Sequence, residues 1–471
     1  MSKISQNMIY KMRSKSPQIL YAVSATLGAM LMGMVIGWSS PAVGFLESGN
    51  FYSPFPVTKD DTQIYGSIFG IGATIGALPA GSVANIIGRC MSMVVFEIIF
   101  IVGWICLAIP RGVWMLNLGR TLQGIGAGAL CAVIPMYVGE ISEPNIRGRL
   151  GAIFEVLSVF GVLYVYIVGA YFNYMTFCAL CGIWSLIHLI GVLFIPESPY
   201  YYLSNDMEEK ASLSLKKLRR ENADTARELD EIKKAISDEK SNHYTFSQVI
   251  SSAVNRKSLF IGISCMFFQQ ACGCSVTLFY MNDIFASTGS AIDPNTAAII
   301  VGFVMFFMTF VTMALLDKAG RKILLVISAC LMGASHMCLG IYYLIYKNSP
   351  EAAKSITWLP LLSLAVYVTG YSTGFGAVPW VVMGEIFSNE LKPYGTGIAT
   401  AMNWILVFFT TYISKNWVRW VGNDGMFFTF SGFCILGALF ALLIMPETKN
   451  RSLAEIQLDL MGEKKQLDNL T

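Results

Sequence analysis

The chain has 471 residues, of which 55% are hydrophobic and only 13% are charged, and its mean hydropathy is +0.57. Soluble domains carry about a quarter charged residues, so this composition excludes an ordinary soluble protein. The formal net charge is only +3. A charge this small gives no indication of a nucleic-acid partner.

Long hydrophobic stretches follow one another along the chain, separated by short polar segments. An apolar stretch of about 20 residues crosses a bilayer as a helix, and helices satisfy their own backbone hydrogen bonds in lipid. The sequence therefore predicts an all-α membrane protein with twelve transmembrane helices. The predicted spans are roughly 18–38, 64–85, 91–109, 113–137, 150–172, 174–195, 258–283, 296–316, 322–346, 358–384, 394–414 and 425–446.

The basic residues predict how these spans are oriented. Twelve spans place both termini on one side, and that side holds 26 of the 33 Lys and Arg residues. Positively charged loops stay in the cytoplasm, so we expect both termini to be cytoplasmic. The first span is too long for a cleaved signal peptide and lacks a small-residue cleavage motif, which predicts an uncleaved anchor.

A polar segment separates the sixth span from the seventh. Residues 206–240 hold nine basic and ten acidic residues, and Ser204 and Asp206 lie at a helix start. The pattern predicts two or three short amphipathic helices, with a disordered tether as the alternative. We expect four parts: an N-terminal six-helix bundle (1–203), a cytoplasmic helical linker (204–257), a C-terminal six-helix bundle (258–448) and a cytoplasmic tail (449–471).

Short charged motifs occur twice in the chain, with offsets of 232, 245 and 250 residues. The matching positions are Arg89 and Arg321, Glu140 and Glu385, and Pro196-Glu197 and Pro446-Glu447. One half of the chain is therefore roughly a copy of the other, which predicts two pseudo-symmetric bundles. Two related membrane halves with matched loops are typical of an alternating-access transporter.

Each copy of the repeat places a carboxylate between two cations at the cytoplasmic end of a span. Such a network can form when the halves meet and break when they part. The alternative is that these residues are interfacial charges that only obey the topology rule. The residues of the predicted gate are Arg89, Glu140, Arg147, Arg321, Glu385 and Lys392.

Polar residues inside the spans predict a binding site. Gln269 and Gln270 are adjacent amides in an apolar helix, so at least one of them faces a cavity or a partner. Glycines and a proline interrupt the tenth span beside Trp380, and interrupted helices at membrane depth mark binding sites. A single buried Gln more often joins two helices. Together with Asn403, however, this set suits a neutral polyol, since amides bind hydroxyls and an indole packs against a sugar ring.

Other functional classes find little support in the sequence. Ten of the eleven cysteines lie inside predicted spans with no His or carboxylate cluster nearby, so we expect no metal and no cofactor. No set of nucleophile, base and oxyanion donors is visible, so we expect no enzyme.

Several motifs together carry a family resemblance. They are GR at 88–89, R-x-x-x-G at 120–124, PMYVGE with RGR at 135–149, PESP at 196–199, QQ-x-x-G at 269–273, D-x-x-GR at 317–321, G-x-x-PW at 376–380 and PETKNRSLAEI at 446–456. The chain resembles the sugar porter family of the major facilitator superfamily over essentially its whole length. Within that family it looks most similar to insect facilitated trehalose and hexose transporters.

The resemblance implies roles for individual residues. Three amides, at Gln269, Gln270 and Asn403, would hydrogen-bond the sugar, and Trp380 would pack beneath it. The aromatic pair that closes the extracellular side in this family aligns with Phe279 and Tyr280.

The sequence departs from the family pattern within the implied pocket. Ser275 stands where the family usually has an Asn, Met305 replaces a second Asn, and Glu155 replaces a Gln of the fifth span. The pocket keeps its core amides but loses at least two amide contacts, so the resemblance does not carry over the identity of the sugar. Ser275 and Glu155 remain candidate substrate-binding residues.

The first span carries information on coupling. Proton-coupled relatives have an Asp directly after an FGY-like triplet, whereas Ser39 follows Ile36-Gly37-Trp38 here, which favours a passive carrier. A carboxylate at membrane depth is costly and indicates function, so a proton–sugar symporter that uses Glu155 is the alternative. Glu155 could instead be partly hydrated near the cytoplasmic end of its span.

We therefore expect a facilitative sugar carrier of the plasma membrane, for a hexose or trehalose, that works by alternating access. Its partners would be the small-molecule sugar and the lipid bilayer, with no nucleic acid, and it would function as a monomer. A sugar sensor that no longer transports is a further alternative. Such sensors usually have a long cytoplasmic tail, but only 25 residues follow Pro446 here.

Overall fold

The computed structural model describes residues 16–47, 55–219, 225–241, 245–289 and 292–461, and the regular structure in these ranges is helical. The predicted all-α fold is confirmed. The N-terminal half contributes α2 (Ser16–Glu47), α3 (Lys59–Ile87), α4 (Arg89–Ala108), α5 (Val113–Ile141), α6 (Pro144–Tyr171) and α7 (Tyr174–Leu193).

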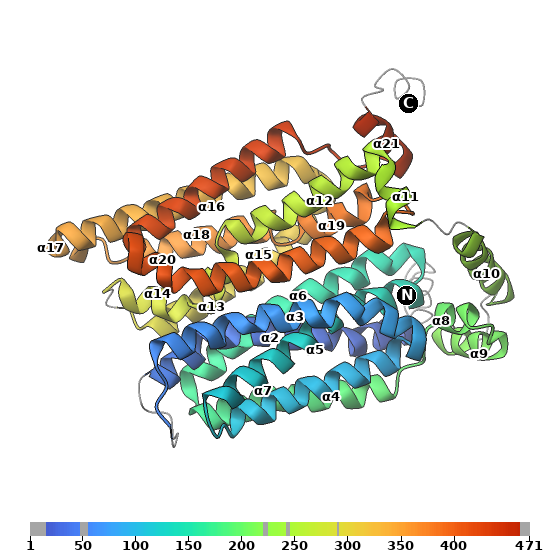
Figure 1. Ribbon diagram of the computed structural model, residues 1–471, viewed down its shortest axis with the longest axis horizontal. Helices are drawn as coiled ribbons and strands as arrows, with labels where there is room; N and C mark the ends of the chain where they lie inside the picture. The colour runs from blue at the N-terminus through green and yellow to red at the C-terminus, as the bar shows by residue number, and fades with distance from the viewer. Residues whose placement is uncertain (1–15, 48–54, 220–224, 242–244, 290–291, 462–471) are drawn as a thin grey trace, which may run out of the picture.

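The C-terminal half contains longer helices that are interrupted by short ones. It comprises α12 (Ala253–Ala271), α13 (Cys274–Phe279), α14 (Met281–Ser287), α15 (Pro294–Ala319), α16 (Arg321–Asn348), α17 (Pro350–Lys354), α18 (Leu359–Thr373), α19 (Val378–Ile386) and α20 (Lys392–Leu443). In Figure 1 the blue and teal helices of the first half fill the lower part of the picture, and the yellow to red helices fill the upper part.

The described residues contain eleven segments that are long and apolar enough to cross a membrane. One of them, α20, has 52 residues, and a straight helix of that length would measure about 78 Å, far more than a bilayer. Gly422 inside α20 has non-helical backbone angles (φ +79°), so two helices join there. The two parts of α20 correspond to the predicted spans 394–414 and 425–446, which is consistent with twelve spans.

Two of the membrane-length segments are broken in the middle. The tenth predicted span is interrupted between Thr373 and Val378, as the glycines there predicted. The seventh span is also interrupted, which was not predicted. There α12 ends and α13 begins around Gly273, whose φ of +82° favours glycine. The short helices α13 and α14 continue the seventh span at an offset from α12.

Short helices gather at one end of the molecule, the right-hand end in Figure 1. They are α8 (Pro199–Ser204), α9 (Glu208–Leu218), α10 (Thr225–Ser241), α11 (Phe246–Ser251) and α21 (Leu453–Met461). We call this the linker end, and the opposite end, with α14 and α17, the far end. The amphipathic linker helices are confirmed and the disordered tether is wrong for the described linker residues. The predicted tail beyond 461 lies outside the described residues.

Close helix contacts hold the first half together. A Cβ placed on Gly124 of α5 would lie 2.3 Å from the carbonyl oxygen of Phe69 in α3, so only glycine permits this approach. Small residues that let backbones touch are a main source of packing between membrane helices, where lipid removes the hydrophobic driving force. Glycine thus brings the backbones of α3 and α5 into direct contact.

Candidate functional site

A cavity of about 2150 Å³ lies between the two halves. Ligand pockets for drug-sized molecules are commonly about 300–1000 Å³, so this cavity has room for a disaccharide and water. Its lining includes Ala235 of α10 and Asn389 after α19, which places its mouth at the linker end. All six residues predicted to bind substrate line it: Glu155, Gln269, Gln270, Ser275, Trp380 and Asn403.

Gln269 and Asn403 form a polar brace across the broken tenth span. The Gln269 Nε2 group donates to the carbonyl oxygens of Phe375 at 2.6 Å and Gly376 at 3.1 Å, which the break leaves without helical partners. Asn403 Nδ2 of α20 donates to Gln269 Oε1 at 2.7 Å. The amide of Gln269 is therefore fully used by the protein in this conformation.

Gln270 has a different environment, because one side of its amide is free. Its Oε1 accepts from Ser275 Oγ at 2.6 Å and from the Cys274 thiol at 3.2 Å. The hydrogen bonds of the Gln270 amide to described residues are all made by this oxygen, which leaves its Nε2 group unused. The buried indole N–H of Trp404, which also lines the cavity, has no partner among the described residues. The Gln270 N–H group can bind a hydroxyl oxygen of a polyol, whereas the Trp404 N–H is covered in this conformation. Trp404 was not predicted, although its place beside Asn403 in an apolar helix was the available signal.

Trp380 and Glu155 complete the cavity wall. Trp380 lies in the first turn of α19 and is half-buried, with its ring against the cavity. Glu155 of α6 is also half-buried, and its carboxylate makes no hydrogen bond or ion pair with any described residue. Cys131 of α5 and Tyr371 of α18 line the same cavity, so Glu155 faces the space between the halves.

Aromatic side chains close the cavity toward the far end. Phe279 and Tyr280, the predicted aromatic gate, are both buried. The Phe69 ring of α3 lies 6.0 Å from the Phe279 ring and 5.7 Å from the Trp404 ring. The Tyr280 hydroxyl packs on Gly66, where a Cβ would meet it at 2.6 Å. The cavity is therefore shut at the far end by contacts between the two halves.

Ion pairs outside this aromatic layer also join the halves. Lys415 Nζ of α20 lies 3.1 Å from Glu47 Oε1 of α2 and donates to Thr62 Oγ1 at 2.8 Å. Arg419 pairs with Asp60 at 2.6 Å. No sequence pattern predicts these pairs, because their partners lie more than 350 positions apart in the chain.

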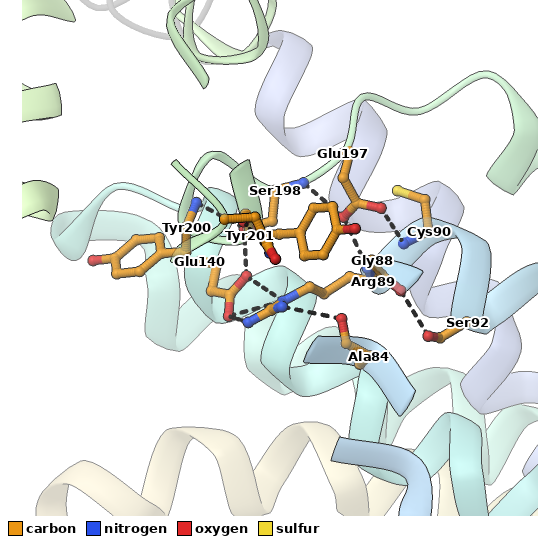
Figure 2. A network of polar contacts seen from close by, with 11 residues as sticks. Ala84, Gly88, Arg89, Cys90, Ser92, Glu140, Glu197, Ser198, Tyr200 and Tyr201 are labelled. Atoms are coloured by element: carbon orange, nitrogen blue, oxygen red, sulfur yellow. Dashed lines mark hydrogen bonds and ion pairs between the residues drawn. The ribbon is translucent and has the colours of Figure 1, made fainter. Parts of the chain in front are cut away.

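At the linker end of the first half, Arg89 lies at the centre of a polar network (Figure 2). Its guanidinium donates to both carboxylate oxygens of Glu140, at 2.9 and 2.8 Å. The backbone N–H groups of Arg89 and Cys90 each donate to Glu197 at 2.9 Å, and the Ser198 hydroxyl donates to Glu140. The network thus ties α4 to α5 and to the segment before α8.

The second half repeats these contacts. The Arg321 guanidinium lies 2.8 Å from Glu385 Oε1, and the Thr448 hydroxyl donates to Glu385 at 2.6 Å. The backbone N–H groups of Arg321 and Lys322 donate to Glu447 at 3.0 and 3.2 Å. The charged motifs that repeat in the sequence therefore form similar arginine–carboxylate contacts in both halves.

The other two predicted gate residues lie apart from these carboxylates. Arg147 Nη2 approaches the carbonyl oxygen of Ser142 at 3.5 Å, and Lys392 Nζ approaches that of Gly384 at 3.4 Å. In this conformation, open at the linker end, Glu140 and Glu385 pair with arginines of their own half. A gate that links the two halves when this end closes stays a prediction.

A buried arginine near the far end has neutral partners. Arg120 of α5 donates to Ser39 Oγ at 2.8 Å, to the carbonyl oxygen of Val35 at 3.0 Å and to Gln123 Oε1 at 3.1 Å. No carboxylate pairs with it among the described residues. Sequence analysis noted Ser39 but missed this contact, because the two positions are 81 residues apart.

Comparison with known proteins identifies the family. The family model described as "Sugar (and other) transporter" matches residues 21–460. The chain is 33% identical over 455 residues to the facilitated trehalose transporter Tret1 of Polypedilum vanderplanki, covering 96% of this chain and 90% of that one. It is 34% identical over 455 residues to Tret1 of Anopheles gambiae, covering 96% of this chain and 57% of the relative.

A solved structure agrees with this assignment. The xylose transporter XylE from E. coli, in a partially occluded inward open conformation, is similar with a TM-score of 0.77 and 25% identity. The match covers 93% of this chain and 100% of that one. The predicted resemblance to sugar porters of the major facilitator superfamily is thus confirmed, and the chain belongs to the sugar transporter family as a multi-pass membrane protein.

Proposed function

We propose that the protein is a facilitative carrier of a sugar, a hexose or trehalose, and not an enzyme. The observation that carries the proposal is the cavity between the halves, lined by amide and indole donors, closed at the far end and open at the linker end. A site that is reachable from one end at a time is what alternating access requires. The names of the relatives above, which refer to facilitated trehalose and to xylose transport, support the substrate class.

The linker end is the cytoplasmic end in this proposal, and the protein acts as a monomer in the plasma membrane. The support comes from the 26 basic residues that the predicted topology places on the linker side. The described conformation then faces inward. Rocking of the two halves would open the aromatic layer at the far end and bring Glu140 and Glu385 toward Arg147 and Lys392.

The sugar contacts follow from the free donors in the cavity. Gln270 Nε2 would donate to a ring hydroxyl, and the Trp380 ring would pack against the C–H face of the sugar. The covered Trp404 N–H would donate to a second hydroxyl once motion of the halves uncovers it. Gln269 and Asn403 would hold the broken helix in place and exchange their internal hydrogen bonds for sugar hydroxyls during closure. Ser275 orients Gln270 through its oxygen.

Passive transport is favoured by the partners of Arg120. A guanidinium stays charged at any physiological pH, and its contacts with Ser39, Val35 and Gln123 are all to neutral groups. No titratable group in this cluster can take up and release a proton in each cycle. Glu155 supports the second candidate, a proton–sugar symporter, because its carboxylate faces the cavity without a partner.

Uptake of labelled hexoses and trehalose into proteoliposomes tests the proposal. We expect the sugar to equilibrate without accumulating, and an inward proton gradient should not change the plateau. Replacing Gln270 by Ala removes one or two hydrogen bonds of about 0.5–1.5 kcal/mol each, so uptake at low sugar concentration should fall several-fold. Accumulation that a protonophore abolishes would replace the facilitator with the symporter, and normal uptake by both Gln269→Ala and Gln270→Ala would remove α12 from the site.

A further inference from the structure

We propose that the substrate this carrier prefers is a cationic amino sugar, whose protonated amine pairs with Glu155. The inference rests on the proposed function, which it narrows from sugars in general to hexosamines. It starts from one feature of the cavity, a carboxylate that nothing in the described protein neutralises.

Glu155 lies well inside the cavity. It is eleven residues from the first residue of α6 at the linker end, which corresponds to about 16 Å along the helix axis. The cation that precedes it on α6 and also lines the cavity, Arg149, is six residues nearer the mouth, or about 9 Å. The other cations that line the cavity, Arg89, Arg321 and Lys392, also lie at the linker end, where the first two are paired with carboxylates.

Away from the linker end, the cavity wall that the second half contributes is polar but neutral. Gln270, Trp380 and Trp404 come from the second half and present an amide and two indoles, whereas Glu155 comes from the first half. A sugar bound between the two walls has its hydroxyls on the neutral donors of one half. Its remaining edge then faces the carboxylate of the other half.

Closure of the cavity makes the charge matter. When the halves close around a sugar, water leaves and an ionised carboxylate without a partner becomes costly in the low-dielectric interior. A hydroxyl can only donate a hydrogen bond to it, whereas an ammonium group also neutralises the charge, and charge-assisted hydrogen bonds are roughly twice as strong as neutral ones. Because Glu155 and the neutral donors sit on different halves, an amino sugar would link the halves during this closure.

A proton could neutralise Glu155 instead, and this alternative makes a different prediction. Protonated Glu155 would bind neutral sugars and carry a proton in each cycle, which is the symporter described above. The amino-sugar proposal predicts no proton-driven accumulation of neutral sugars. The two mechanisms are therefore separated by the charge of the preferred substrate and by the response to a proton gradient.

The test is uptake of labelled D-glucosamine and D-glucose into proteoliposomes at pH 6.5, where an aliphatic amine of pKa about 8 is mostly charged. The two sugars differ at one ring position, by NH₃⁺ against OH. We expect the wild-type kcat/KM to favour glucosamine by about tenfold, and N-acetylglucosamine, which has no charge, to compete poorly. Glu155→Gln should lower the glucosamine-to-glucose ratio by about tenfold, and Glu155→Asp should keep most of it.

Glu351→Gln is the matched control, since Glu351 is an exposed carboxylate of α17 at the far end and outside the cavity. It should leave the ratio unchanged. A wild-type preference for glucose would overturn the proposal, and this measurement does not depend on the folding of any variant. An unchanged glucosamine-to-glucose ratio in Glu155→Gln would also overturn it. Neutral-sugar accumulation under a proton gradient that Glu155→Gln abolishes would overturn it in favour of the symporter. Absence of uptake for every sugar would instead reject the proposed function itself.

Discussion

In the first half, the Arg89 and Glu140 side chains expose 8% and 15% of their surface, whereas Arg321 and Glu385 in the second half expose 13% and 28%. The two networks share the arginine–carboxylate pair, the hydroxyl that donates to that carboxylate, and backbone N–H groups that donate to a second carboxylate. Water that reaches Glu385 weakens its attraction to Arg321. The same water also lowers the free-energy cost of leaving Glu385 without Arg321. The comparison teaches that repeated geometry does not imply equal energy, and that the first copy should be the harder one to disturb.

The largest expected effect follows from removing the central arginine of each copy. Arg89→Ala leaves Glu140 buried without its partner, and breaking a buried pair in this way costs about 3–5 kcal/mol. Arg321→Ala leaves a more hydrated Glu385, so we expect a smaller cost of about 1–3 kcal/mol. Thermal midpoints of the purified proteins in detergent should fall in that order.

Lys354→Ala is the control for this pair of variants, because Lys354 forms an exposed ion pair with Glu351, and such pairs contribute at most about 1 kcal/mol. Its thermal midpoint should stay close to that of the wild type. Equal losses in Arg89→Ala and Arg321→Ala would show that burial does not distinguish the two copies.

An intermediate effect is expected from the contrast between the two ends of the molecule. Polar contacts that cross between the halves gather at the far end, where Lys415 bonds Glu47 and Thr62, whereas the linker-end networks each stay within one half. Lys415→Gln should therefore favour opening of the far end. Neutralising Glu385 should instead favour the conformation open at the linker end, if it takes part in the gate proposed above. Each shift should be about tenfold or less, since one partly exposed pair contributes about 1 kcal/mol.

Thiol labelling can measure these opposite shifts. A cysteine at Ala152, which lines the cavity near its mouth, should react faster in Glu385→Gln and more slowly in Lys415→Gln. A cysteine at Ser414, buried near the far end, should show the reverse. Unchanged labelling in Glu385→Gln would show that the linker-end charges determine orientation in the membrane but do not act as a gate. Unchanged labelling in Lys415→Gln would show that the aromatic layer alone keeps the far end closed.

The sequence predicted the linker end well, because repetition identifies equivalent positions without any structure. The repeated motifs grouped Arg89 with Glu140 and Arg321 with Glu385, and the structure brings each of these pairs into contact. They also grouped Arg147 and Lys392 with the carboxylates, and those two side chains lie apart from them in this conformation. Nothing comparable exists at the far end, where Lys415 meets Glu47 across 368 positions and only the fold brings the two together. Local sequence patterns predict helices, and repeated motifs predict which positions in the two halves are equivalent. Ion pairs between distant segments depend on how the two halves pack.

The cavity was predictable to a similar degree. Gln269, Gln270 and Asn403 were candidates because amides are rare in apolar helices. The structure adds which amide atoms are free: Gln269 is occupied by carbonyls that the break after Thr373 exposes, whereas Gln270 keeps an unused N–H group. That distinction depends on the offset between α18 and α19, which no local sequence pattern encodes.

The smallest expected effect is a difference in pH response between Glu197 and Glu447, the equivalent carboxylates of the two copies. Burial raises the pKa of Glu197 above its usual range, although the backbone N–H groups of Ser198, Cys90 and Arg89 oppose this. Burial also raises the pKa of Glu447, but four backbone N–H groups, starting with that of Lys449, outweigh it and hold the pKa below its usual range.

These shifts have opposite consequences for stability. A carboxyl whose pKa is raised by folding contributes stability below its unfolded pKa of about 4.3 and loses that contribution as the pH rises through the folded value. A carboxyl whose pKa is lowered contributes stability above about 4.3 and loses it as the pH falls through the folded value. Acidification from neutral pH to about 4.5 should therefore increase the contribution of Glu197 to the free energy of unfolding, and only further acidification should decrease the contribution of Glu447. We expect Glu197→Gln to flatten the first part of a plot of thermal midpoint against pH, and Glu447→Gln to flatten the last part, by a few degrees at most.

Glu455→Gln is the control, because it removes an exposed carboxyl of lowered pKa in α21, outside both networks. Its pH profile corrects for the effect of losing any acidic group at this end. Identical pH profiles for Glu197→Gln and Glu447→Gln, after that correction, would show that the two copies titrate alike despite their different burial.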